Sequence, residues 1–136
     1  MKKIITIIVC SISFLVLSAC VSKKKLILPE SEKISVISLQ KKLSEDVKTI
    51  NKREEISKLI EEIQKQSKST TLESLNDQPT NVKDYIIIKF THQNEENDSV
   101  AYLYTMKEKQ YIEQPYVGIW EVSPDIANRI EETFSS

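Results

Sequence analysis

The first twenty residues decide how much of this chain is available to fold. Two lysines follow the initiator methionine, and an almost wholly apolar run occupies residues 4–17. A run of about 14 residues fits the core of a signal peptide and is shorter than the roughly 20 residues that cross a bilayer. The small residues Ser18 and Ala19 follow, as expected before a cleavage site. We therefore predict a cleaved signal peptide over residues 1–19, with an uncleaved signal anchor as the alternative.

The four residues Leu17-Ser18-Ala19-Cys20 resemble the lipobox of bacterial lipoproteins. This resemblance implies transfer of a diacylglyceryl group to the Cys20 sulfur and cleavage before Cys20, often with a further acyl chain such as palmitate on the new amino group. Two or three acyl chains hold a protein stably on a bilayer, whereas one chain holds it only marginally. The resemblance therefore implies a lipid-anchored protein on the extracytoplasmic face of the cell membrane.

The residues after the predicted cleavage site divide into a tether and one domain. We predict a lipidated tether over residues 20–33 and a single domain over residues 34–136. The run Lys23-Lys24-Lys25 comes directly after the lipid site. It can act as a solvated spacer, and each Lys near an anionic surface also adds about 1 kcal/mol of attraction. A tether of this length keeps the domain close to the membrane.

Composition limits both the fold and the function of the mature chain. Cleavage leaves 117 of the 136 residues, enough for one ordinary domain. The 19 basic residues fall to 17 against 20 acidic ones, so the charge does not indicate nucleic-acid binding. Cys20 is then the only cysteine, so the fold is expected to depend on its core and on no disulfide within the chain. The single glycine, Gly118, excludes a glycine-rich phosphate loop.

The first part of the predicted domain has two alternatives. Residues 34–40 and 47–50 are rich in β-branched side chains and flank a polar turn, which favours a β-hairpin. Apolar residues between Leu39 and Ile50 also recur at a spacing of 4, 4 and 3, which is typical of a helix. The clustering of β-branched residues makes the hairpin the preferred alternative.

Residues 51–66 form the clearest predicted helix. Asn51 and Glu54 have the spacing of a capping box, and the apolar residues that follow lie on one helical face. Residues 67–84 are polar and rich in turn formers. They predict a loop that is longer than most connections in compact domains, and such loops are often functional.

Four further strands are expected, at residues 85–91, 100–106, 111–113 and 117–122. The first of them is apolar on both faces, as in a strand that is covered on two sides. Ser123 and Pro124 then begin a final amphipathic helix, as N-cap and first helical residue. These elements predict an α+β fold, with an antiparallel sheet of about five strands and two amphipathic helices packed on one face.

Few residues indicate catalysis or metal binding. His92 is the only histidine and is expected in an exposed hairpin loop, whereas a zinc site uses several His or Cys ligands. Residues 94–98 are rich in oxygen atoms but lack the glycine and the distal glutamate of a calcium loop. The many carboxylates are typical of an acidic surface and do not by themselves indicate acid–base chemistry. We predict no catalytic residue, no metal and no cofactor.

The aromatic stretch YIEQPYVGIW, residues 111–120, gives the strongest indication of a binding surface. Tyr111, Tyr116 and Trp120 are the candidate binding residues, because Tyr and Trp are common anchors at interfaces. Strand alternation places Tyr116 and Trp120 on one side if pairing continues through Pro115. The alternative is that these rings pack under a helix as ordinary core.

Two acidic residues are candidates for fixing the long loop at residues 67–84. Asp77 lies in a turn-like motif beside a proline and is expected to accept backbone N–H bonds within its own loop. Glu113 lies two residues before Pro115, and we expect it to hydrogen-bond back to the loop and tie it to the sheet.

Four segments together carry a family resemblance: SLNDQP at 74–79, YIIIKF at 85–90, YIEQPYVGIW at 111–120 and SPDIANRIEETF at 123–134. They resemble small lipoproteins of Gram-positive bacteria that contain a domain of unknown function. The resemblance covers roughly residues 26–134 and implies no particular activity.

The sequence therefore predicts a membrane-anchored binding or interaction module at the outer face of the cytoplasmic membrane. Its partners would be the membrane, through the lipid on Cys20, and an unknown envelope protein, peptide or wall component, but no nucleic acid. One alternative is a cell-envelope enzyme, such as a wall hydrolase that uses carboxylates. Another is a structural surface protein without a specific ligand.

Overall fold

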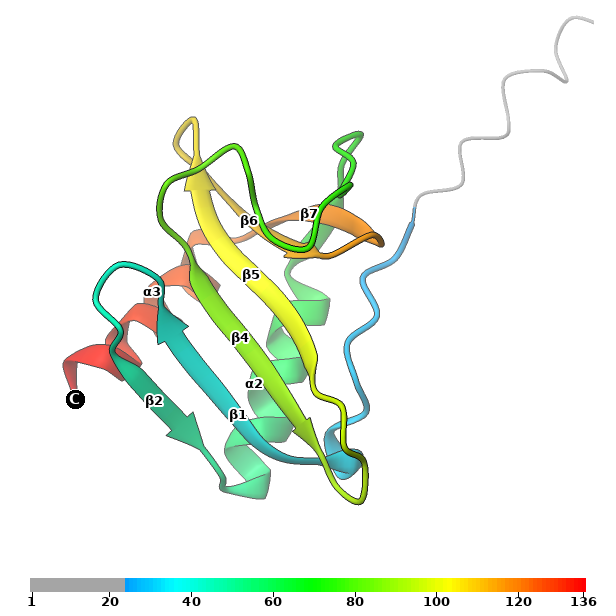
Figure 1. The fold of residues 1–136 in the computed structure, drawn as a ribbon, viewed down its shortest axis with the longest axis vertical. Coiled ribbons are helices and arrows are strands. Elements are labelled where there is room, and N and C mark those ends of the chain that lie inside the picture. The colour runs from blue at the N-terminus through cyan, green and yellow to red at the C-terminus, as the bar shows by residue number, and fades with distance from the viewer. Residues whose placement is uncertain (1–23) are drawn as a thin grey trace, which may run out of the picture.

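A seven-stranded antiparallel sheet organises residues 24–136, which are the residues that the computed structural model describes (Figure 1). The elements in chain order are η1 (Ser31–Lys33), β1 (Ile34–Lys41), β2 (Val47–Ile50), α2 (Arg53–Lys65), β3 (Ser67–Ser69), β4 (Ile86–His92), β5 (Ser99–Met106), β6 (Lys109–Gln114), β7 (Gly118–Val122) and α3 (Pro124–Ser135). Across the sheet the strand order is β2-β1-β4-β5-β6-β7-β3. The predicted signal peptide and Cys20 lie outside the described residues.

Strands β1 and β2 form the hairpin that the sequence favoured over a helix. Ile37 pairs with Ile50, and Gln40 pairs with Val47. On its other side β1 pairs with β4, so that Leu39 lies opposite Ile88. Their β-branched side chains suit a pleated, half-buried surface, and pairing along both edges of β1 stabilises the extended conformation.

The prediction of about five strands with two helices packed on one face is wrong, because the sheet has seven strands. The strand expected at residues 111–113 is longer and spans the whole of β6, Lys109–Gln114. The short strand β3 lies in the segment predicted as loop and pairs antiparallel with β7 through backbone hydrogen bonds. Its side chains, Ser-Lys-Ser, carry no apolar alternation, so no sequence pattern marks it. The fold remains in the α+β class.

Apolar side chains form two clusters on the two faces of the sheet, since successive residues of a strand point to opposite sides. The larger cluster combines the isoleucines and leucine of α2 and the apolar face of α3 with sheet residues such as Ile88 and Phe90. The smaller cluster, on the other face, contains Tyr85, Tyr104, Tyr111 and Ile119. Both faces of the sheet are therefore used for packing.

The loop between β3 and β4 covers part of the second face. Figure 1 shows this loop in front of the sheet, on the side away from α2. Val82, near its end, packs against the tyrosine cluster, and Tyr85 belongs to it. Ser74, near its start, is buried although its neighbours are exposed. Side chains near both ends of the loop are thus buried against the sheet.

Neither α2 nor α3 has a side-chain hydrogen bond at its N-cap. Helix α2 has Lys52 at its N-cap without a side-chain bond, so the predicted capping box of Asn51 and Glu54 does not form. Helix α3 has Pro124 in its first turn, as predicted. Ser123 stands at its N-cap, but the Ser123 hydroxyl bonds to the side chain of Gln66 and not to the helix.

The N-terminal segment from Lys24 packs along the sheet. Leu26 and Leu28 are almost completely buried and belong to the larger cluster. Gln114 Nε2 donates a hydrogen bond to the Ile27 carbonyl at 2.9 Å. Part of the segment assigned to the tether at 20–33 therefore contributes to the core. Within residues 24–136, no helix is long and apolar enough to cross a membrane.

Candidate functional site

The turn between β6 and β7 presents Tyr116 at the surface. Sheet pairing ends at Gln114 and Gly118, and the Val117 N–H closes the turn on the Gln114 carbonyl at 3.0 Å. Tyr116 has φ 62°, a left-handed conformation that is uncommon for a residue with a side chain. Its side chain is 66 % exposed. The turn therefore holds an aromatic residue outward in a conformation that costs energy.

Two hydrogen bonds fix Tyr116 against the long loop. Its backbone N–H donates to Ser74 Oγ at 3.3 Å, and its hydroxyl donates to Asp77 Oδ1 at 2.7 Å. The bond to Asp77 raises the pKa of the Tyr116 hydroxyl above its usual value. Asp77 thus contacts the β6–β7 turn through its side chain. Tyr85 holds the same loop further along, by donating to Gln78 Oε1 at 2.9 Å.

The other two candidate binding residues are buried. Trp120 is 2 % exposed and lies in the larger cluster, with its Nε1 donating to the Lys24 carbonyl at 2.9 Å. Tyr111 is 9 % exposed and packs beside Tyr104 in the tyrosine cluster. Tyr116 lies in the turn and not on the strand, so the alternation expected to align it with Trp120 does not apply. Of the three rings, only that of Tyr116 can reach a partner in this conformation.

Glu113 is a buried carboxylate that links the sheet to the loop. It is 5 % exposed, and Ser74 is the only other buried polar residue among those the structure describes. Ser74 Oγ donates to Glu113 Oε1 at 2.6 Å, and the Tyr104 hydroxyl donates to Glu113 Oε2 at 3.0 Å. Burial of a carboxylate is costly unless hydrogen bonds compensate it, and both oxygens have such a bond. Burial and the adjacent Glu113 raise the pKa of Tyr104 far above its usual value.

These contacts form one connected set from β5 to the surface. Tyr104 contacts Glu113, Glu113 contacts Ser74, Ser74 contacts Tyr116, and Tyr116 contacts Asp77. The set joins residues that lie up to 42 positions apart in the chain. The exposed tyrosine is therefore supported by a buried framework. Ser74 and Tyr104 were not among the residues singled out from the sequence.

An exposed apolar surface surrounds Tyr116. We define the Tyr116 surface as Leu72, Leu75, Tyr116 and Val117, whose exposed fractions are 39, 69, 66 and 46 %. All four line a groove of about 440 Å³, together with Lys24 and the β7 residues beside the turn. Sequence reasoning missed Leu72, Leu75 and Val117. The available signal was two leucines in an otherwise polar loop.

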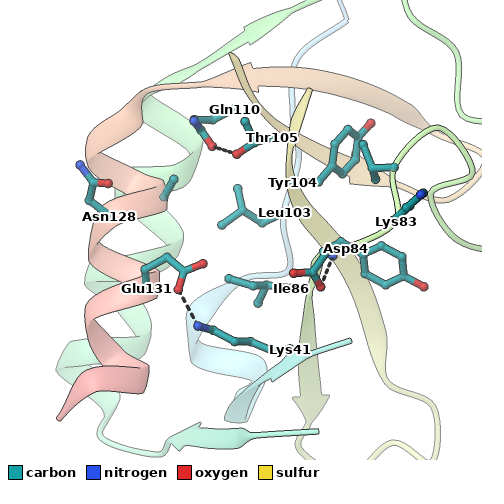
Figure 2. Close-up of a pocket in the computed structure, with 13 residues that line it drawn as sticks. Lys41, Lys83, Asp84, Ile86, Leu103, Tyr104, Thr105, Gln110, Asn128 and Glu131 are labelled. Atoms are coloured by element: carbon teal, nitrogen blue, oxygen red, sulfur yellow. Dashed lines mark hydrogen bonds and ion pairs between the residues drawn. The ribbon is translucent and has the colours of Figure 1, made fainter. Parts of the chain in front are cut away.

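A second hollow lies between α3 and the first residue of β4 (Figure 2). Its volume is about 480 Å³, and Ile86 and Leu103 form part of its apolar floor. Lys41 and Glu131 pair across it at 2.8 Å, and this contact raises the pKa of Lys41. Thr105 Oγ1 also donates to Gln110 Oε1 at 2.6 Å. Four of the polar residues that line this hollow thus already bind one another in pairs.

Metal-binding groups do not converge in the part of the chain that the structure describes. Within residues 24–136, no group of three or more His, Cys, Asp or Glu side chains is placed to hold a metal ion. His92 ends β4, with its Nε2 2.6 Å from Ser99 Oγ and its side chain 13 % exposed. The expectation of an exposed loop histidine is therefore wrong.

Comparisons with known proteins identify a domain and a fold without an activity. The family model DUF5301, whose description reads "Domain of unknown function (DUF5300)", matches residues 22–121. The NMR structure of a protein from Ruminococcus gnavus is similar, with a TM-score of 0.61 and 26 % sequence identity. That similarity covers 76 % of this chain and 99 % of the other. No curated protein matches this chain.

Proposed function

The chain belongs to the DUF5301 family, a domain of unknown function, and we propose that it is a lipid-anchored binding module on the extracytoplasmic face of the cell membrane. The anchor would be the lipid on Cys20, which the lipobox-like residues 17–20 imply. The contact surface would be the Tyr116 surface, which engages a component of the cell envelope.

The observation that carries the proposal is the exposure of Tyr116 on a preorganised support. Residues with side chains adopt a positive φ at a cost, and such conformations persist only where the surroundings hold them. Tyr116 is held in this way by Ser74 and Asp77, although its ring adds nothing to the core. Aromatic residues that are exposed on rigid supports are typical anchors of binding surfaces.

Polypeptide connectivity also favours a role at the membrane. Lys24 lines the groove beside the Tyr116 surface, and only three residues separate it from Cys20. The surface is therefore close in the chain to the proposed lipid.

Two measurements on intact cells test the proposal. For the anchor, the wild-type protein is expected in the membrane fraction with an acyl mass on its Cys20 peptide, and the Cys20→Ser variant is expected without that mass. For the surface, single cysteines at Val117→Cys and Leu43→Cys carry a short photoactivated cross-linker, and each adduct is identified by mass spectrometry. Leu43 is a matched control, because it is 70 % exposed in the β1–β2 turn at the opposite edge of the sheet.

We expect a defined adduct at position 117 at severalfold higher yield than at position 43. Loss of that adduct in a folded Tyr116→Ala background would identify the ring as the anchor. Equal yields at the two positions would contradict the binding surface, and a wild-type protein without an acyl mass on its Cys20 peptide would contradict the lipid anchor.

A further inference from the structure

We propose that the envelope component in contact with the Tyr116 surface is the anionic bilayer itself, so that the domain lies on the membrane in a fixed orientation. This inference rests on the proposed function, because it takes the lipid on Cys20 as the point of attachment. It goes further by naming the partner of the surface and the direction in which the domain faces.

Chain length places the Tyr116 surface within reach of the lipid headgroups. Residues 20–24 span at most about 14 Å when fully extended, at roughly 3.5 Å per residue. Lys24 itself is fixed to the domain: its Nζ donates to the Val117 carbonyl at 2.5 Å, and its carbonyl accepts from Trp120 Nε1 at 2.9 Å. The attachment point of the domain, Lys24, therefore lies directly beside the Tyr116 surface.

The chemistry of the surface suits the interfacial region of a bilayer. Leu72, Leu75 and Val117 provide apolar contact, and tyrosine is enriched where apolar chains meet headgroups. Ile27, on the adjacent N-terminal segment, is a further apolar side chain with 73 % exposure. An exposed apolar surface beside the lipid anchor adds contact with the bilayer, because membrane binding strengthens with the apolar area that is buried.

Charge adds to the attraction. Three lysines, Lys23, Lys24 and Lys25, lie between the lipid site and the domain core. A lysine close to an anionic leaflet strengthens binding about fivefold. Two carboxylates lie in the same region: Glu73 lines the groove, and Asp77 accepts the Tyr116 hydroxyl. The lysines outnumber them, which favours anionic over neutral lipid.

The orientation follows from the rigidity of the support. Trp120 fixes the N-terminal segment, and Glu113 and Ser74 fix the loop that carries Leu72 and Leu75. The surface and the attachment point therefore move as one body. With this face on the bilayer, the β1–β2 hairpin at the other edge of the sheet points into the extracytoplasmic space.

Quenching of a fluorophore by a quencher in the headgroup region tests the orientation of the full-length, lipidated protein. The protein is reconstituted into vesicles of phosphatidylglycerol and phosphatidylcholine that contain a headgroup-region quencher, with a polarity-sensitive dye at Val117→Cys, Leu75→Cys or Leu43→Cys. Two positions on the surface are used so that a local effect of one substitution does not decide the result. Pure phosphatidylcholine vesicles measure the contribution of lipid charge.

We expect quenching at positions 117 and 75 to exceed that at position 43 at least threefold, with a blue-shifted emission. The difference should decrease in pure phosphatidylcholine and in a variant that combines Lys24→Glu with Lys25→Glu. Equal quenching at all three positions, in protein that remains vesicle-bound, would overturn the fixed orientation while leaving the lipid anchor intact.

The cross-linking experiment distinguishes this inference from the broader proposed function. A lipid adduct at position 117 supports both. A single, defined protein adduct or a wall-fragment adduct there supports the binding module and overturns the bilayer contact. A wild-type chain that is absent from the membrane fraction overturns both.

Discussion

Replacement of Glu113 by glutamine removes one charge from the buried framework and almost no volume. In the wild type, the carboxylate accepts hydrogen bonds from Ser74 at 2.6 Å and from Tyr104 at 3.0 Å. In Glu113→Gln, one oxygen can still accept the Ser74 hydroxyl. The amide NH₂ then faces Tyr104, whose hydroxyl must rotate to accept in place of donating.

The expected loss in the free energy of unfolding follows from these two hydrogen bonds. A hydrogen bond to a charged group contributes about 1.5–3 kcal/mol, and one between neutral groups about 0.5–1.5 kcal/mol. Two bonds therefore lose about 2–3 kcal/mol together, and the smaller desolvation cost of a neutral amide returns part of it. The net decrease in the free energy of unfolding should be about 1–2 kcal/mol. For a domain of this size, that decrease corresponds to a fall in Tm of about 4–8 °C.

Chemical denaturation and limited proteolysis together check this prediction. Urea unfolding gives the global change, and the rate of trypsin cleavage after Lys83, which is exposed in the long loop, reports on the loop itself. Because Glu113 holds the loop through Ser74, cleavage should accelerate more than the global change alone explains. Glu96→Gln is the matched control, since Glu96 is exposed between β4 and β5, and a change below about 0.5 kcal/mol is expected there.

The reasoning would be refuted by a Glu113→Gln protein with the stability of the Glu96→Gln control and an unchanged rate of cleavage after Lys83. Such a result would mean that the buried carboxylate contributes nothing beyond its shape. In Glu113→Ala, by contrast, both hydroxyls lose their acceptor, and a larger loss of about 3 kcal/mol is expected.

Three further predictions concern the surroundings of this framework. In Gly118→Ala, the new Cβ would lie 2.9 Å from Cη2 of the buried Trp120 ring, so urea unfolding should show a loss of about 1–3 kcal/mol; an unchanged midpoint would mean that the ring moves freely. In Trp120→Phe, the bond to the Lys24 carbonyl is lost, so trypsin should cleave after Lys24 several times faster, whereas an unchanged rate would show that the other contacts of the segment hold it without the indole bond. The folded-state pKa of Tyr104 is raised, so the folded chain retains a proton that the unfolded chain releases above about pH 10, and stability must fall there as pH increases. Tyr104→Phe should make this fall shallower by up to about 1.4 kcal/mol per pH unit, as measured by urea unfolding between pH 9 and 11, and parallel curves would contradict the assignment.

The spacing of residues in the sequence was sufficient to predict the elements that form because of their own side chains. Residues 51–66 contain α2 because their apolar residues recur with the helical period and have one face to bury. Pro124 marks the start of α3 because a proline at the first turn loses no helical hydrogen bond. The β1–β2 hairpin could be preferred but not decided, because the spacing of its apolar residues also fits a helix.

Burial, by contrast, was decided by what lies opposite each residue. Tyr116 and Trp120 are four positions apart in one aromatic stretch, yet one is exposed and the other is core. The difference arises because the turn directs Tyr116 away from the sheet, while the N-terminal segment covers Trp120 from the other end of the chain. The segment that covers Trp120 cannot be identified from the stretch itself.

The sequence by itself determined the α+β class, the positions of the helices and most strands, and the candidate residues of the aromatic stretch. Only the tertiary structure decided that Ser67–Ser69 form a strand, because β3 exists through backbone pairing with β7. Only the tertiary structure brought Ser74 to Glu113, across 39 positions of chain, and Leu72 and Leu75 to Tyr116. Side-chain periodicity records which face of an element is buried, whereas contacts between distant elements depend on how the whole sheet is assembled.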